Sequence, residues 1–79
     1  MATPKTEEDW AERVHRHLKA ELKRADVTYE ELAARMKKHG FKETKASIAS
    51  KLSRNTAPAA FFVAALVAIG CEAVKLGDI

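Results

Sequence analysis

The sequence predicts an all-α domain of four or five helices. Three observations support this fold class: apolar residues recur at helical spacing, a threonine or proline precedes each expected helix, and Gly40 and Gly70 follow two of them. With 79 residues, 47% of them hydrophobic and 32% charged, the chain has the composition of one folded domain with a small core. We therefore expect a single domain over residues 1–79, with a flexible N-terminus (1–6) and a short C-terminal tail (72–79).

The first helix is expected from about Glu7 to Arg24. Thr6 can cap its start, and three acids follow in the first turn, where they meet the positive end of the helix dipole. Four apolar residues recur at steps of four and form one stripe that we expect to face the core: Trp10, Val14, Leu18 and Leu22.

The second helix is expected to begin after Thr28. Glu31 lies three residues later and completes a capping box, and the apolar positions fit one helical face: Tyr29, Leu32, Ala33 and Met36. The helix should stop at His39 and Gly40, because glycine suits the left-handed position after a helix. Phe41 then falls where a Schellman motif returns it to Met36.

The third helix is expected from its cap, Thr44, to about Arg54, with Asn55 in the left-handed conformation that ends it. Three apolar residues should face inward: Ile48, Ala49 and Leu52. The opposite face carries only hydroxyls and cations, uninterrupted by an acid: Lys45, Ser47, Ser50, Lys51 and Arg54.

Charge is concentrated around this third helix. Residues 35–54 carry a net charge of +6, with Glu43 as the single acid, whereas the rest of the chain carries −3. A localised basic patch on a small domain is typical of a protein that binds a polyanion.

The fourth helix should begin near Pro58 and end at Gly70. No residue from 57 to 70 is charged, but these 14 residues are fewer than the roughly 20 that span a membrane. We expect a core helix whose remaining apolar surface supports a homodimer through Phe61, Phe62 and Leu66. Val74 and Leu76 alternate with polar residues in the tail, as in an extended segment.

Several function classes lose support from the sequence. His15 and His17 lie on different sides of a helix, the serines lack a paired histidine and carboxylate, and Cys71 follows an apolar helix as a packed thiol would. We expect that the chain is not an enzyme and that it binds no metal, cofactor or small-molecule substrate. The single cysteine and the lack of an apolar leader favour the cytoplasm.

Three strings carry a family resemblance: TYEELAARM, TKASIASKLSRN and PAAFFVAALVAIGC. Together they resemble the lambda-repressor-like helix-turn-helix domains, which include phage Cro and many bacterial regulators. The match covers about residues 18–71, and Thr28, Ala33 and the pair Ile69-Gly70 fit the family pattern. The turn is longer than the family's, which suggests an uncharacterised bacterial group of such domains.

The resemblance implies that the third helix is the recognition helix and lies in the DNA major groove. We therefore expect sequence-specific binding of double-stranded DNA by a homodimeric transcriptional regulator. The expected contacts are Thr28, Tyr29, Lys42, Thr44, Lys45, Ser47, Ser50, Lys51 and Arg54, with Lys37 and Lys38 beside the backbone. The alternative is a protein–protein interaction module of the same fold that docks through its apolar fourth helix.

Overall fold

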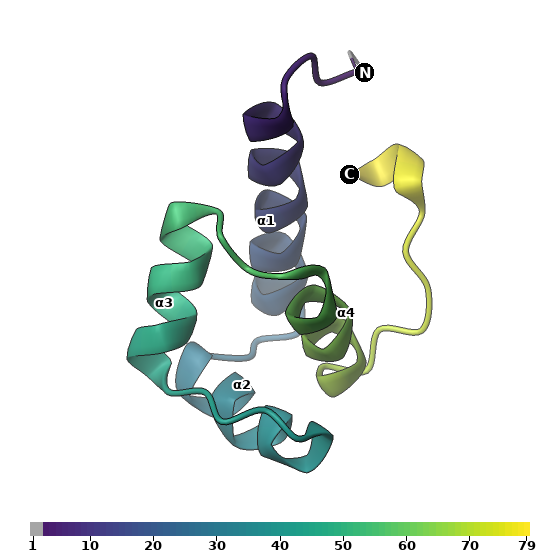
Figure 1. The fold of residues 1–79 in the computed structure, drawn as a ribbon. Helices are drawn as coiled ribbons and strands as arrows, with labels where there is room; N and C mark the ends of the chain where they lie inside the picture. Colours follow the sequence, from purple (N-terminus) through teal and green to yellow (C-terminus); the bar gives the residue numbers. More distant parts are fainter. Residues whose placement is uncertain (1–2) are drawn as a thin grey trace.

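The computed structural model describes residues 3–79 and contains four α-helices, with no strand in this range (Figure 1). The helices are α1 (Glu7–Arg24), α2 (Tyr29–Met36), α3 (Lys45–Arg54) and α4 (Ala59–Ala68), and two 3-10 turns accompany them, η1 (Lys37–His39) and η2 (Leu76–Asp78). The predicted all-α architecture is confirmed. Residues 1 and 2, part of the N-terminus expected to be flexible, lie outside the described residues.

Helix α1 begins and ends at the predicted residues, and Thr6 Oγ1 accepts a hydrogen bond from the Asp9 backbone N–H at 3.1 Å. Its predicted apolar stripe is buried only in part. Leu18 and Leu22 are buried, but Trp10 is 49% exposed. The first turns of α1 extend beyond the other three helices (Figure 1), and the Trp10 side chain lines a surface hollow with residues of the N-terminal segment and of η2.

The buried polar residue of α1 is His15, which joins the helix to the connection before α4. Its Nδ1 lies 2.6 Å from the Ala11 carbonyl oxygen, and its Nε2 lies 2.9 Å from the Ala57 backbone nitrogen. A carbonyl can only accept and a backbone N–H can only donate, so the hydrogen of the neutral ring sits on Nδ1. His15 thus ties α1 to a segment 42 residues later in the chain.

Helix α2 begins as expected, with Thr28 Oγ1 accepting from the Glu31 backbone N–H at 3.1 Å. This is one of the two hydrogen bonds of the predicted capping box, and the reciprocal bond to the Glu31 side chain does not form. The Glu31 carboxylate instead accepts a hydrogen bond from Arg35 at 2.7 Å, one turn further along the helix. Arg35 also donates to the Ala68 carbonyl at 3.3 Å, so the same side chain joins the end of α4 to α2.

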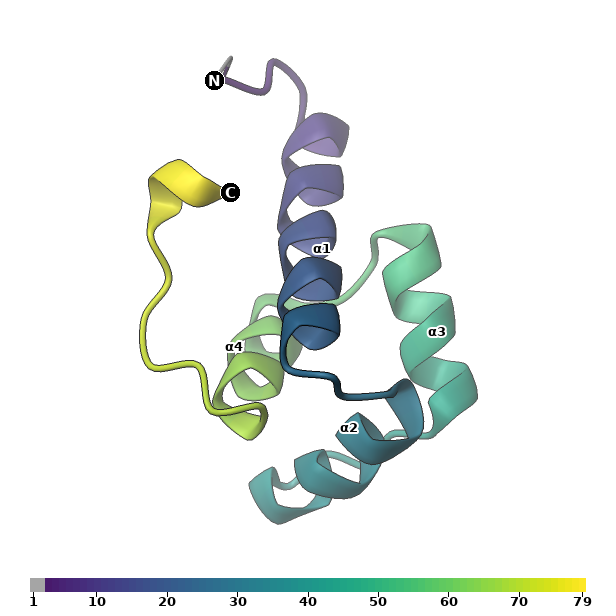
Figure 2. The same ribbon diagram turned by 180° about the vertical axis from the view of Figure 1, so that it is seen from behind.

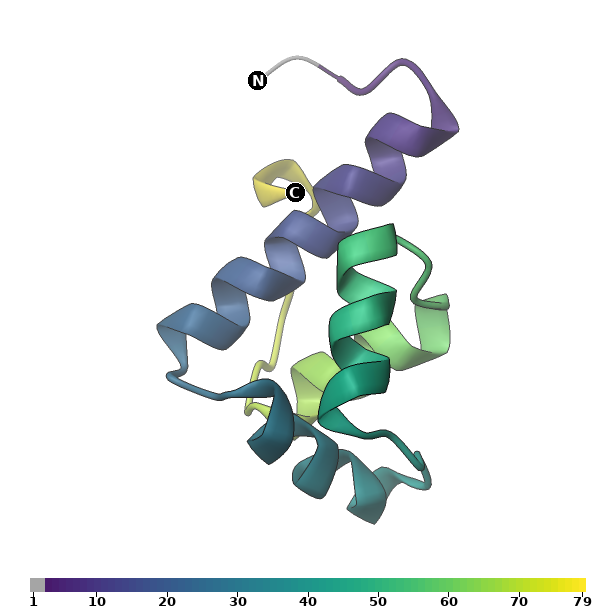
Figure 3. The ribbon, with the colours of Figure 1, turned by 90° about the vertical axis from the view of Figure 1, so that its left-hand side faces the viewer.

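The predicted stop of α2 is confirmed after one 3-10 turn. Gly40 has φ +84°, and the Phe41 N–H bonds the Met36 carbonyl at 3.1 Å, the long bond of a Schellman motif. The chain then runs back along α2, so that α3 begins beside the start of α2 (Figures 1 and 3). Eight residues, 37–44, thus separate the two helices.

Helices α2, α3 and α4 pack around one core, against which the second half of α1 lies (Figure 2). Its largest fully buried side chains come from all four helices: Leu18, Leu32, Met36, Ile48, Leu52 and Phe61. Phe41, from the segment before α3, meets the ring of Phe61 edge-on with 6.3 Å between centroids. Ala33 is buried in the same core.

Helix α4 uses its largest side chains inside the single chain. Phe61 and Leu66, expected at a dimer interface, are buried in the core, and Phe62 is half-buried with its ring 6.4 Å from that of His17. The expectation that Phe61 and Leu66 remain exposed is therefore corrected. Both α1 and α2 contact α4, and together they cover more of its side chains than the sequence predicts.

The exposed apolar side chains of α4 are Val63 (58%) and Val67 (53%), which lie one turn apart. After Gly70, at φ +85°, the tail returns along α1 and closes with η2 rather than pairing as a strand (Figure 2). None of the helices described for residues 3–79 is long and apolar enough to cross a bilayer.

We predict that Gly40→Val destabilises the protein by about 1–3 kcal/mol, whereas Gly77→Val changes stability by less than about 0.5 kcal/mol. A Cβ at either position would meet no atom within 4 Å, but only Gly40 of this pair has a positive φ. Backbone strain alone should therefore separate the two variants. Urea denaturation of both would measure the difference, and equal stabilities would show that the turn does not depend on its left-handed residue.

We predict that His15→Phe lowers the free energy of unfolding by about 1–3 kcal/mol, because it leaves the Ala57 N–H without its acceptor. His17→Phe is the matched control. His17 is half-buried two residues further along α1, and its ring packs against Phe62. Thermal unfolding of the two variants checks this. A His15→Phe protein as stable as the His17→Phe protein would contradict the bridging role.

Candidate nucleic-acid interface

Helix α3 presents one strip of short side chains to solvent. Ile48 and Leu52 on the opposite side are fully buried and fix which way the helix faces. The exposed strip consists of Ala46, Ser50, Ser53 and Arg54, and Lys45 is exposed at the first position of the helix. Two residues of the strip, Ser50 and Arg54, are predicted DNA contacts. The other two, Ala46 and Ser53, are not among the predicted contacts.

Ser47 is engaged in the start of α3. Its backbone N–H donates to Thr44 Oγ1 at 3.0 Å, and its Oγ accepts from the Thr44 backbone N–H at 2.8 Å, so a complete capping box forms. The Ser47 hydroxyl donates in turn to Glu43 Oε1 at 2.7 Å. Ser47 and Thr44, both predicted DNA contacts, thus use their side-chain oxygens within the chain.

Lys51 is held between two groups of the protein. Its Nζ lies 2.5 Å from Glu43 Oε2 and 5.0 Å from the centroid of the Phe61 ring. The Glu43 side chain is 8% exposed and that of Lys51 31% exposed. An ion pair that is largely withdrawn from water, with an aromatic face beside its cation, is stronger than a surface pair.

The expectation that no acid interrupts the face of Ser47 and Lys51 is corrected. Glu43 precedes the helix in the chain, but its carboxylate folds back onto that flank and contacts both side chains. Spacing along the helix could not reveal this contact, because Glu43 lies outside the helical repeat. The flank is therefore neutral, and the cationic surface lies elsewhere.

Five cations near α3 are exposed and form no ion pair with any residue of the described range 3–79: Lys37, Lys38, Lys42, Lys45 and Arg54. Arg35, in the same basic window, is paired with Glu31. Four of the five lie on the segment that leads into α3 or at its first residue. Arg54 lies at the opposite end of the helix.

Thr28 and Tyr29 lie at the start of α2, beside the start of α3 (Figure 3). Thr28 is exposed but its Oγ1 caps the helix, and Tyr29 is half-buried against the core. The exposed acid Glu30 follows them directly. The start of α2 thus lies beside the start of α3 and brings no cation to it.

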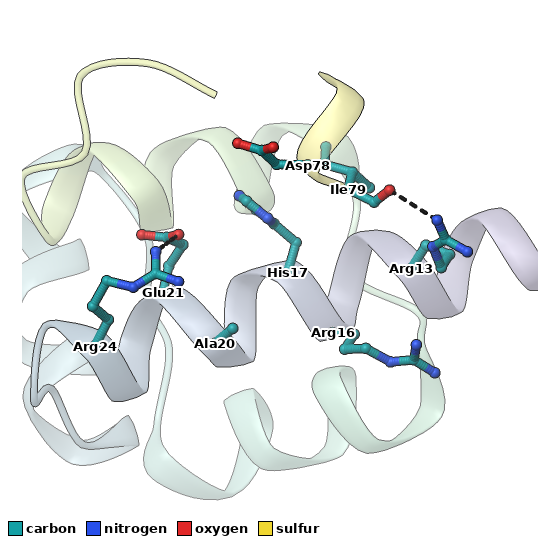
Figure 4. Close-up of a pocket in the computed structure, with 8 residues that line it drawn as sticks. All are labelled: Arg13, Arg16, His17, Ala20, Glu21, Arg24, Asp78 and Ile79. Atoms are coloured by element: carbon teal, nitrogen blue, oxygen red, sulfur yellow. Dashed lines mark hydrogen bonds and ion pairs between the residues drawn. The ribbon is translucent and has the colours of Figure 1, made fainter. Parts of the chain in front are cut away.

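A second concentration of arginines lies on the far side of α1, in a hollow of about 300 Å³ closed by the C-terminal turn (Figure 4). Arg13 donates to the Ile79 carbonyl at 3.2 Å, Arg16 pairs with Glu12, and Arg24 pairs with Glu21. These guanidinium groups already have partners, so this hollow is a weaker anion site than the surface near α3.

Comparison with known families identifies a matching domain family. A family model described as a domain of unknown function, DUF6471, matches residues 10–74, which include all four helices except the first turn of α1. No curated protein and no solved structure matches the chain. The matched range covers the core and the segment 37–44, so these features belong to the part of the chain shared with that family.

We predict that Ser47→Ala destabilises the protein by about 1 kcal/mol, because it removes the acceptor of the capping box and a hydrogen bond to Glu43. Ser50→Ala should change stability by less than about 0.5 kcal/mol, since Ser50 is exposed on the same helix and its hydroxyl caps nothing. Chemical denaturation distinguishes the two. Equal effects would mean that Ser47 is as free as Ser50.

Proposed function

We propose that the chain, which belongs to the DUF6471 family, binds double-stranded DNA by placing α3 in the major groove. The observation that supports this best is the exposed strip of α3. It consists of three short side chains and Arg54, contains no acid, and begins next to the exposed Lys45. We also propose that the chain is a lambda-repressor-like regulator in which α3 is the recognition helix.

The shape of the strip suits a groove. The major groove of B-DNA is about 12 Å wide and admits one α-helix, whose outward side chains must be short for the helix to approach the bases. Ala46, Ser50 and Ser53 meet that requirement. Serine hydroxyls can donate to or accept from base edges, and Arg54 can donate two hydrogen bonds to a guanine.

The cations of the preceding segment suit the phosphates on either side of the groove. Lys37, Lys38 and Lys42 are exposed on the segment that leads into α3. The first turn of α3 adds free backbone amides and the positive end of its dipole. Contacts of this kind fix the position of a protein on the duplex, whereas Ser50 and Arg54 would read its sequence.

The alternative function is a protein–protein interaction module that docks through α4. The exposed side chains of Val63 and Val67 favour it, and the same pair could join two copies of the chain. The apolar surface is small, however, because Phe61 and Leu66 are buried. The exposed strip of α3 and the unpaired cations beside it have no role in this alternative, and for that reason we favour DNA binding.

We predict that a variant with Lys42→Ala, Lys45→Ala and Arg54→Ala loses affinity for duplex DNA, and that the slope of log K against log salt falls by about 0.9 for each phosphate contact removed. A labelled duplex titrated at two or more salt concentrations measures both quantities. All three side chains are exposed, so the fold should be retained within about 0.5 kcal/mol per substitution.

The matched control replaces Lys5, Lys19 and Lys75 with alanine. These lysines are also exposed and carry the same total charge, but they lie on or before α1 and in the tail. The control should keep the salt slope of the parent. Equal losses in both variants would indicate diffuse electrostatic attraction, and no binding by the parent protein would refute the proposed function in favour of docking through α4.

A further inference from the structure

We propose that Glu43 lowers the affinity of the domain for DNA of any sequence by holding Lys51 out of reach of the phosphates. The inference rests on the proposed function, because it concerns the flank of the same helix. It assigns Glu43 and Lys51 to control of the site rather than to contact with DNA.

The geometry leaves neither group free. One oxygen of the Glu43 carboxylate accepts from Ser47 Oγ at 2.7 Å and the other lies 2.5 Å from Lys51 Nζ. The Phe61 ring lies beside the same ammonium, 5.0 Å away at its centroid. A phosphate would have to displace a carboxylate that is 8% exposed and remove the cation from the aromatic face.

Lys51 nevertheless lies where it could reach DNA. It is half-buried on the edge of the exposed strip, one residue after Ser50 and one turn before Arg54. A lysine side chain is long and flexible enough to swing outward from such a position. What prevents this in the structure is the ion pair, since no other residue described in the chain is bonded to its Nζ.

Restraining one lysine lowers affinity for DNA of every sequence, because phosphate contacts do not depend on the bases. Each phosphate contact adds affinity for specific and non-specific DNA alike, and the genome offers far more non-specific sites. An internal carboxylate that occupies Lys51 removes one such contact. Affinity for both kinds of site then falls by the same factor, and the ratio between them is left to the residues of the exposed strip.

The test is the affinity of the full chain for a labelled duplex of random sequence, measured against salt. Glu43→Gln removes the charge but keeps an acceptor for Ser47, so Lys51 should swing out. We expect a salt slope about 0.9 steeper and, at about 0.15 M salt, roughly five-fold tighter binding. Glu72→Gln is the control, because it removes an equal charge from an exposed tail residue without an ion pair in the range 3–79.

The double variant Glu43→Gln with Lys51→Met should return the slope to that of the parent, since methionine keeps the packing against Phe61 without the charge. A gain that persists in the double variant, or an equal gain in Glu72→Gln, would overturn the inference. If the parent does not bind while Glu43→Gln does, the restraint of Lys51 by Glu43 is supported and the proposed function of the parent fails. If neither binds, both proposals fail.

A measurement on the parent protein covers the case in which Glu43→Gln does not fold. Addition of duplex DNA should shift the side-chain ¹⁵N resonance of Lys45, which is exposed, and leave that of Lys51 in place. A Lys51 shift as large as the Lys45 shift would show that the ion pair opens on DNA and would overturn the inference.

Discussion

The ring of Phe61 is the point on which the arrangement of this chain depends. It comes from α4, is fully buried, and receives the edge of Phe41 on one side and the ammonium of Lys51 on another. Phe41 belongs to the segment before α3 and Lys51 to α3 itself, so the candidate recognition helix and the segment that leads into it both contact this one side chain. A domain of 79 residues has few such anchors, because its core is small.

Local sequence signals were sufficient to predict the helices. Thr6, Thr28 and Thr44 cap α1, α2 and α3, and the left-handed Gly40 and Asn55 follow the residues where helical structure ends. These signals act within a few residues, so they can be read without knowing the fold. What they could not supply was the tertiary environment: Trp10 shares the period of the α1 stripe but lies beyond the other helices, and His15 is buried by a contact 42 residues away.

The candidate site, like the fold, was predictable from the sequence only in part. The position of α3 and the concentration of cations around it follow from the sequence, and Ser50 and Arg54 do lie on the exposed strip. Ser47 and Lys51 share the helical spacing of those residues, yet they are engaged by Glu43. Helical periodicity assigns a residue to a face, but a side chain that folds back from a loop can change the charge of that face without altering the period.

The segment between α2 and α3 is fixed at its two ends, and Glu43 within it is held by Ser47 and Lys51. The Phe41 N–H is tied to Met36 and the Thr44 side chain to Ser47, whereas Lys42 lies exposed between them. A substitution of Lys42 would therefore leave these contacts in place, so the surface charge beside α3 can change at little cost in stability.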